Sequence, residues 1–340
     1  MFQIGVTRDF LGPDGSIGFG DIGLDLLDGA GIAWEFLPDS EGEISPEHAR
    51  RFDGLLVLAP RVTGRTVEGA DRLQVVARFG VGYDNVDVPA CTRSGVLLTI
   101  TPEGVRRPVA VAALTLLLAL SHKLLIKDRL VREGRWADRL SHNGQGVTGR
   151  TLGIIGLGNI GRELATLARP FGISLIGHDP WVTPEATAAA GVAHVPLDEL
   201  LGRADYVCVC CALTPDTHHL LNADRIALLK PTAYLINVAR GPIVDQAALY
   251  EALRGRKIQG AGLDVFEREP VSPDDPMLQL ENVILAPHAL CWTDECFRLN
   301  GRSAIASLID VARGVTPRHV VDRDALTHHR LRHLRPREDA

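Results

Sequence analysis

A G-x-G-x-x-G spacing near the middle of the chain, formed by Gly156, Gly158 and Gly161, limits the possible folds more than any other feature. The apolar run Leu152–Ile155 precedes it, and the amphipathic stretch Arg162–Phe171 follows it. Between a strand and a helix, the first glycine permits a tight turn and the second lets a pyrophosphate approach the backbone. The third lets the helix pack close to the sheet. The spacing therefore predicts a dinucleotide-binding βαβ unit.

An acidic residue follows the next predicted strand. Asp179 stands just beyond Ser174–Ile176, close to the ~20-residue offset at which a carboxylate binds the adenosine ribose hydroxyls. No Arg or Lys directly follows Asp179, which favours NAD over NADP. Asn159 and Ile160 open the helix, whose free N–H groups attract phosphate, so we include them in the predicted cofactor site. An ordinary turn with a loop acid is the alternative, which the two signals together disfavour.

The region from Thr151 to His288 alternates apolar runs with amphipathic stretches. Asn222 can cap a helix over 223–229, and Asp245 can cap another that ends near Gly255. Strands separated by helices imply right-handed crossovers and a doubly wound parallel sheet. The strand-like runs are Leu152–Ile155, Ser174–Ile176, Tyr206–Cys211, Ala233–Val238, Gly260–Val265 and Val283–Leu285.

A second, smaller α/β domain is predicted from the first hundred residues. A helical stretch from about Arg107 to Arg132, opened by Pro108, links it to the cofactor domain, and a helix from Glu295 to Arg313 returns to it. We therefore expect a Rossmann domain over 104–292 and a discontinuous flavodoxin-like substrate domain over 1–103 and 293–340, both with doubly wound parallel sheets. Its strand-like runs are Phe2–Val6, Trp34–Leu37, Gly54–Leu58, Gln74–Phe79 and Val96–Thr99.

Charge gives no support for nucleic-acid binding, since the formal net charge is -6. The exception is the Arg- and His-rich end of the chain, Arg318 to Arg337. A solvated or partner-crossing tail explains that segment better than a binding patch does.

The cysteine pattern and the absence of targeting signals predict a soluble, cytoplasmic protein. Three of the six cysteines lie in the run Tyr206–Cys211, where alternate side chains of a strand point to opposite faces and are poorly placed to share a metal. We expect no metal site. The N-terminus lacks a basic region followed by an apolar stretch, and the longest apolar run, Val109–Leu120, is short for a membrane span.

Three chemically capable side chains stand just past predicted strand ends: Arg240, Glu269 and His288. Ligands of doubly wound sheets bind beyond the carboxyl ends of the strands, so these residues are candidates for one site. An imidazole exchanges a hydroxyl proton, a carboxylate fixes its tautomer and favours its protonated form, and a guanidinium grips a substrate carboxylate. Each alone is also compatible with a surface or structural role. Their joint placement favours alcohol–ketone interconversion.

Five segments together resemble the signature blocks of the D-isomer-specific 2-hydroxyacid dehydrogenases, and the resemblance extends from about Met1 to Val321. These segments are Arg78-Phe-Gly-Val-Gly-Tyr-Asp-Asn-Val-Asp87, Thr151-Leu-Gly-Ile-Ile-Gly-Leu-Gly-Asn-Ile-Gly-Arg162, Leu235-Ile-Asn-Val-Ala-Arg-Gly241, Gly262-Leu-Asp-Val-Phe-Glu-Arg-Glu-Pro270 and Asn282-Val-Ile-Leu-Ala-Pro-His288.

The resemblance implies roles for individual residues. Arg240 would grip the substrate, Glu269 would be the acid partner, and His288 would donate or accept the proton. Family members are usually dimers joined through the cofactor domain, with catalysis between the domains. The resemblance also implies that the substrate carboxylate meets the backbone N–H groups of Val81 and Gly82, that Asp264 binds the nicotinamide carboxamide, and that Leu213, Thr214, Val238 and Ala239 lie near it.

The chain departs from the family pattern at three places. Ala212 replaces a usual proline, and Ala113-Leu114 replaces a frequent acid–histidine pair. After His288, where small residues are common, the chain has Ala289-Leu-Cys-Trp-Thr293. Trp292 is either a packing residue at the domain junction or part of the substrate pocket.

Two classes of function fit these residues. The first is an NAD-dependent reductase of a small 2-oxo acid such as hydroxypyruvate or glyoxylate, acting without nucleic acid or membrane as a homodimer. Phosphoglycerate is less favoured because the chain ends too soon for a separate regulatory domain, and an oxidoreductase of formate or phosphite would share Arg240. The second class is an NAD-sensing binding protein like the transcriptional corepressors that resemble this family.

Overall fold

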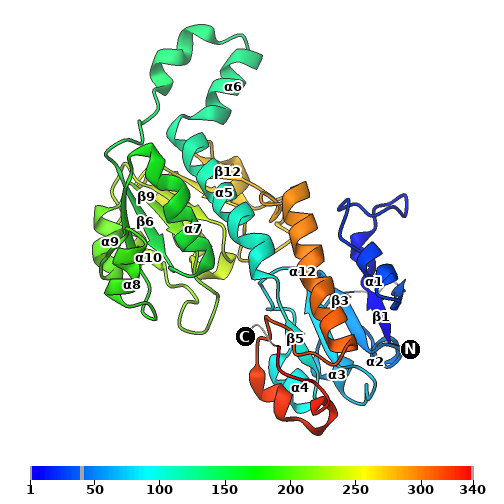
Figure 1. The fold of residues 1–340 in the computed structure, drawn as a ribbon. Coiled ribbons are helices and arrows are strands. Elements are labelled where there is room, and N and C mark those ends of the chain that lie inside the picture. The colour runs from blue at the N-terminus through cyan, green and yellow to red at the C-terminus, as the bar shows by residue number, and fades with distance from the viewer. Residues whose placement is uncertain (1, 39–41, 338–340) are drawn as a thin grey trace. The chain divides into compact units, whose positions relative to one another are not determined.

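The computed structural model describes residues 2–38 and 42–337. They fall into two compact units, one within Met1–Val105 and Trp292–Ala340 and the other over Arg106–Cys291 (Figure 1). Each unit holds one sheet in which every strand pair is parallel. The predicted fold class, two parallel α/β domains, is confirmed.

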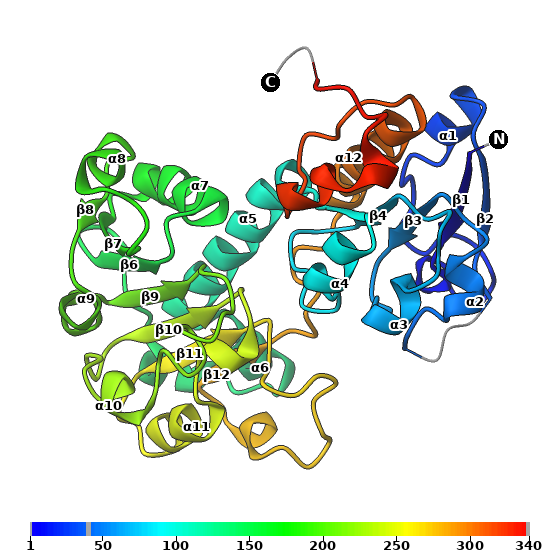
Figure 2. The ribbon, with the colours of Figure 1, turned by 90° about the horizontal axis from the view of Figure 1, so that it is seen from below.

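The second unit contains a seven-stranded sheet in the order β12-β11-β10-β9-β6-β7-β8, and Figure 2 shows β9 to β12 side by side. From β6 the chain adds β7 and β8 on one side and β9 to β12 on the other, so the topological switch point lies between β6 and β9. The glycine motif follows β6. The strands are β6 (Thr151–Ile155), β7 (Ser174–His178), β8 (Ala193–His194), β9 (Tyr206–Val209), β10 (Tyr234–Asn237), β11 (Gly260–Leu263) and β12 (Val283–Leu285).

Helices cover both faces of this sheet. Side chains alternate between the two faces along each strand, and both sets are apolar, so each face needs a covering layer. Tyr206 and Cys208 pack in the apolar cluster with α5 and α7, whereas Val207 and Val209 pack in the cluster with α9 and α11. The helices are α5 (Pro102–Ser121, which begins in the first unit), α6 (Leu124–Arg132), α7 (Asn159–Ala168), α8 (Pro184–Ala189), α9 (Leu197–Arg203), α10 (Ala223–Ile226) and α11 (Gln246–Arg254), with 3-10 turns η2 (Trp136–His142), η3 (Arg169–Phe171), η4 (Gly241–Ile243) and η5 (Pro276–Gln279).

The first unit contains a five-stranded sheet in the order β2-β1-β3-β4-β5, the flavodoxin-like order. Helices α1 and α12 cover one face, and α2, α3 and α4 cover the other. The elements are β1 (Gln3–Val6), β2 (Ala33–Phe36), β3 (Gly54–Val57), β4 (Val75–Arg78), β5 (Leu97–Thr99), α1 (Asp25–Gly29), α2 (Pro46–Ala49), α3 (Gly64–Val67), α4 (Val88–Arg93) and α12 (Asp294–Ala312), with η1 (Arg8–Phe10), η6 (Arg323–Thr327) and η7 (His329–Leu331).

Helix capping follows the sequence closely in the second unit. The Asn222 side chain accepts a hydrogen bond from the Arg225 N–H, and Asp245 accepts one from the Ala248 N–H. Both caps satisfy amide groups that the first helical turn leaves free, so both predicted caps are confirmed, although α10 ends at Ile226 rather than at Leu229.

The helical stretch predicted from Arg107 to Arg132 ends at Arg132 as expected, but it begins earlier than predicted and is interrupted. Pro102 rather than Pro108 opens α5, Pro108 lies inside the helix, and left-handed Lys123 separates α5 from α6. Among the described residues, α5 is the one helix that could cross a membrane by length and composition, but 56% of its most apolar window is buried. Its apolar side chains, such as Leu116 and Leu117, belong to the core of the second unit.

The C-terminal segment is also different from the solvated tail that its charges suggested. Leu331 is 1% exposed. The Arg330 guanidinium donates hydrogen bonds to the carbonyl oxygens of Ser94, Ala70 and Leu73 at 2.6, 3.0 and 3.0 Å. Apolar burial and this multiply bonded guanidinium fix the segment to the first unit.

Candidate active site

The glycine motif follows β6 and opens α7. Gly156 has φ +92°, and a Cβ there would lie 2.5 Å from the Cys211 nitrogen. A Cβ at Gly161 would lie 2.1 Å from the Gly156 carbonyl oxygen, whereas a Cβ at Gly158 would meet nothing within 4 Å. The first and third glycines are therefore required by close packing, and the second leaves the helix N-terminus open to a ligand. This cradle fits a dinucleotide pyrophosphate.

Asp179 stands at the carboxyl end of β7, beside the glycine loop. Its carboxylate accepts a hydrogen bond from the Leu157 N–H at 2.8 Å and another from the Trp181 N–H at 2.9 Å. The bond from Leu157 fixes the Asp179 carboxylate next to the motif, where a carboxylate is needed to bind the adenosine ribose hydroxyls. The residues present thus fit NAD.

The loops after β9 and β10 carry four further predicted cofactor residues, Leu213, Thr214, Val238 and Ala239. Thr217 ties the first loop, since its hydroxyl accepts from the Thr214 N–H at 2.7 Å and donates to the Ala212 carbonyl at 2.7 Å. In the second loop, the Ala239 N–H donates to the Asn237 side chain at 3.0 Å. These hydrogen bonds hold both loops at the carboxyl edge of the sheet, where ligands of such sheets bind.

Asp264 lies just past β11 and is 4% exposed. Its carboxylate accepts hydrogen bonds from the Ala289 N–H at 3.0 Å and the Leu290 N–H at 3.1 Å. Burial raises the pKa of Asp264, against the lowering effect of these two bonds. The carboxylate therefore anchors the chain immediately after His288.

Glu269 and His288 form a hydrogen-bonded pair, with 2.7 Å between the Glu269 Oε2 and His288 Nδ1 atoms. The other carboxylate oxygen accepts from the Phe266 N–H at 2.9 Å. Burial raises the pKa of Glu269, but the bond with His288, the Phe266 N–H and the charges of His288 and Arg240 outweigh it and hold that pKa below its usual range. An ionised carboxylate in this position orients the ring through the His288 Nδ1 atom.

Arg240 follows β10, one residue before a close contact between two loops. A Cβ at Gly241 would lie 1.9 Å from the Phe266 carbonyl carbon, so the loops after β10 and β11 touch. The Arg240 carbonyl accepts from the Asn237 side chain at 2.9 Å, and its charge acts on Glu269. The structure therefore brings Arg240, Glu269 and His288 together at one edge of the sheet.

Val81, Gly82 and Trp292 belong to the first unit. Val81 and Gly82 follow β4, and within residues 2–38 and 42–337 their backbone N–H groups donate no hydrogen bond. Trp292 is 49% exposed, and its ring centroid lies 5.1 Å from that of Phe19 and 5.8 Å from that of Phe297. The indole is thus both a packing residue and partly open.

A second histidine–glutamate pair was not predicted. His219 Nε2 contacts Glu267 Oε1, joining the loop after β9 to the loop that carries Glu269. Glu267 stands four residues past β11 and shares that position with the predicted site residues, whereas His219 lies well beyond the end of β9, and no sequence pattern indicates it.

Comparison with known proteins identifies relatives across most of the chain. Residues 114–289 match the family described as D-isomer specific 2-hydroxyacid dehydrogenase, NAD binding domain. A glyoxylate reductase of Korarchaeum cryptofilum is 39% identical over 284 residues, covering 82% of this chain and 86% of that protein.

Two further proteins show how far the similarity extends. A D-3-phosphoglycerate dehydrogenase of Methanocaldococcus jannaschii is 38% identical over 277 residues, covering 81% of this chain but only 52% of that protein. The crystal structure of a glyoxylate reductase from Paecilomyes thermophila superposes with a TM-score of 0.79 at 26% identity, covering 94% of this chain and 98% of that one.

Proposed function

This chain belongs to the D-isomer specific 2-hydroxyacid dehydrogenases, which are NAD-dependent oxidoreductases, and we propose that it interconverts a small 2-oxo acid and its D-2-hydroxy acid. The His288–Glu269 pair at 2.7 Å is the observation that carries this proposal. It supplies a proton donor on the same sheet edge as the dinucleotide cradle. Glyoxylate and hydroxypyruvate are the substrates that we expect, and the relatives named glyoxylate reductase support the first of them.

We assign cofactor binding, and substrate carboxylate binding by Arg240, to the second unit. Gly158, Asn159 and Ile160 would hold the pyrophosphate and Asp179 the adenosine ribose. Leu213, Thr214, Val238, Ala239 and Asp264 would surround the nicotinamide end. When bound, NADH supplies the hydride for reduction.

His288 would move the proton. Its Nδ1 is engaged by Glu269, so Nε2 is the nitrogen left to donate a proton to the carbonyl oxygen of a 2-oxo acid. Glu269 would keep the ring in the tautomer that this transfer requires and would stabilise the imidazolium. In the oxidative direction, neutral His288 would accept the hydroxyl proton at the same atom.

Arg240 would bind the substrate carboxylate through its planar guanidinium, which offers two parallel N–H donors. In the first unit, the N–H groups of Val81 and Gly82 would donate to a carboxylate, and Trp292 would contact the substrate side chain with its exposed face. These contacts would orient the substrate for transfer.

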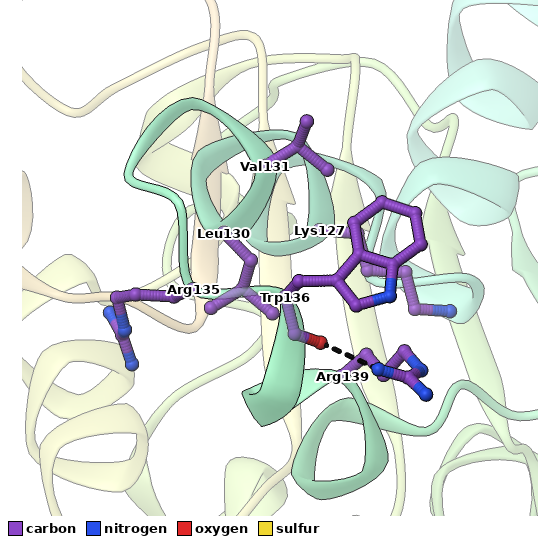
Figure 3. Close-up of a pocket in the computed structure, with 6 residues that line it drawn as sticks. All are labelled: Lys127, Leu130, Val131, Arg135, Trp136 and Arg139. Atoms are coloured by element: carbon purple, nitrogen blue, oxygen red, sulfur yellow. Dashed lines mark hydrogen bonds between the residues drawn. The ribbon is translucent and has the colours of Figure 1, made fainter.

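We also propose that two copies associate through the segment formed by α6 and η2. Figure 3 shows a shallow pocket here, lined by apolar and basic residues. Exposed Leu124, Leu125, Val131, Trp136 and Leu140 make this surface unusually apolar, which is typical of an interaction site. Sedimentation should give a dimer for the parent and a monomer for the double variant Trp136→Glu, Leu140→Glu. An unchanged mass would reject this surface.

We place the enzyme in the cytoplasm, where reducing conditions keep thiols unbridged. The sulfur atoms of Cys208 and Cys210 lie 3.7 Å apart without a disulfide. Fractionation of cells should recover the protein with cytosolic markers, and recovery in a secreted fraction would contradict this.

Turnover of 2-oxo acids tests the proposed function. Purified protein with NADH should reduce glyoxylate or hydroxypyruvate within a panel that also contains pyruvate, phenylpyruvate and 3-phosphohydroxypyruvate, and should yield the D-isomer where the product is chiral. Tight NADH binding without turnover of any panel member would instead support an NAD-sensing protein.

A further inference from the structure

The second histidine–glutamate pair joins three loops that carry the candidate site. His219 lies on the loop after β9, and its Nε2 contacts the carboxylate of Glu267 on the loop after β11. The His219 N–H donates to the Pro242 carbonyl on the loop after β10 at 2.8 Å. One histidine therefore bonds to both neighbouring loops.

Backbone contacts extend this junction. The Leu221 N–H donates to the Ile243 carbonyl at 3.0 Å, so the first loop runs along the second. Because a Cβ at Gly241 would overlap the Phe266 carbonyl group, the second loop is pressed against the third. A shift of any one loop would thus be resisted by the other two.

His219 adopts a left-handed backbone conformation, with φ 48°. This region is unfavourable for residues with a side chain, although His tolerates it better than most. Such conformations persist where the surroundings hold them. His288 shares this conformation, with φ 54°, so both paired histidines are held away from ordinary backbone geometry.

The junction leads directly to the Glu269 carboxylate. Glu267 is held at its side chain by His219 and at its N–H by the Gln246 side chain at 3.1 Å. The preceding Phe266 N–H donates to Glu269 at 2.9 Å. Fixing Glu267 therefore fixes the donor that orients the carboxylate bonded to His288.

We propose that His219 and Glu267 are positioning residues that clamp the loop after β11, so that Glu269 stays aligned with the proton-donating His288. This inference rests on the proposed function. His219 and Glu267 are not proposed to contact substrate or cofactor; they act through Phe266 and Glu269.

Other charged groups near the pairs must be separated from this effect. Arg240 and Asp264 act electrostatically on the Glu269–His288 pair. The His218 ring stacks on that of His219 at 4.2 Å between centroids, and Arg268 lies between the two glutamates in sequence. Arg268 therefore serves as the matched control, because the His218 ring packs directly on the clamp histidine.

Glu267→Ala breaks the clamp, whereas Glu267→Gln keeps an acceptor for the His219 Nε2–H. For the Ala variant we expect a three- to tenfold lower kcat for 2-oxo acid reduction. The alkaline limb of kcat/KM should shift to lower pH, while the NADH dissociation constant stays within twofold. Glu267→Gln should restore the parent kcat and pH profile, and Arg268→Ala should match the parent.

A second readout does not need turnover. The NMR titration of the His288 ring in the protein without substrate should shift to lower pH in Glu267→Ala but not in Glu267→Gln or the Arg268→Ala control. If the parent reduces no 2-oxo acid, the proposed function fails while this titration still tests the clamp. If Glu267→Ala matched the parent both in the kinetics and in the His288 ring titration, the inference would be overturned. Equal damage in the Ala and Gln variants with a lower Tm would also overturn it, because it would show only general support of the loop.

Discussion

The two histidine–glutamate pairs of the second unit lie at the same sheet edge and look alike as contacts. Both histidines have left-handed backbones, and both partners come from the segment that directly follows β11. They differ in the ring nitrogen used: His288 engages its glutamate through Nδ1, whereas His219 engages Glu267 through Nε2. We infer from this difference that a histidine–carboxylate pair does not by itself mark a proton donor.

The surroundings distinguish the pairs further. Glu269 accepts an additional hydrogen bond from a backbone N–H, and the charge of Arg240 lowers its pKa. Buried Asp264 anchors the residues that follow His288. His219 instead bonds through its own backbone to a neighbouring loop. Preorganised donors and charges around a reacting group are what catalysis requires, so we assign chemistry to His288 and positioning to His219.

Removing each ring separates the two roles most strongly. His288→Ala should lower kcat/KM for 2-oxo acid reduction by ~10²-fold or more at every pH, because a general acid is lost. His219→Asn, which tolerates the left-handed backbone, should cost less than about tenfold. Steady-state kinetics with NADH measures both, and comparable losses would erase the distinction between the pairs.

Asp179 tests whether cofactor binding is separable from either pair. Asp179→Ala should weaken NADH binding and reduce discrimination against NADPH by about 1–3 kcal/mol, the range for loss of a hydrogen bond to a charged group. The pH profile should keep its shape, because His288 and Glu269 are untouched. Dissociation constants for both cofactors provide the measurement. Equal use of NADH and NADPH by the parent would contradict the assignment.

Arg240 sharpens the comparison because its charge acts on Glu269. Arg240→Lys keeps that charge but loses the planar two-point grip on a carboxylate, so kcat/KM should fall by at least about tenfold (~1.4 kcal/mol). The pH dependence should change little. Unchanged kinetics would remove Arg240 from substrate binding.

The sequence was informative wherever structure is local. Apolar runs predicted β6, β10 and the other long strands, and Asn222 and Asp245 marked helix starts through single side chains. The strand β8 escaped prediction because it contains only Ala193 and His194, too short for any alternation. The limits of α5 were missed because Pro108 is tolerated inside a helix that tertiary packing supports.

The features that could not be predicted from the sequence depend on contacts between residues far apart in the chain. The C-terminal segment has a polar composition, yet Arg330 reaches carbonyl groups more than two hundred residues earlier in the chain. His219 and Glu267 lie on separate loops with no shared pattern, and only the sheet order brings them together. The candidate triad could be proposed because strand ends of a parallel sheet meet at one edge, but the pairing geometry required the structure.

The pH dependence of Glu269→Gln tests the central claim most directly, with Glu267→Gln as the matched control two residues away. His288 holds the pKa of Glu269 below its usual range. A carboxylate charge beside an imidazole favours the charged form of the ring, and Glu269→Gln removes that charge. We expect Glu269→Gln to move the alkaline limb of kcat/KM for reduction, and the acid limb for oxidation, to lower pH, while the Glu267→Gln profile coincides with that of the parent. A Glu269→Gln profile that coincides with the parent in both directions would show that this carboxylate does not control the proton donor.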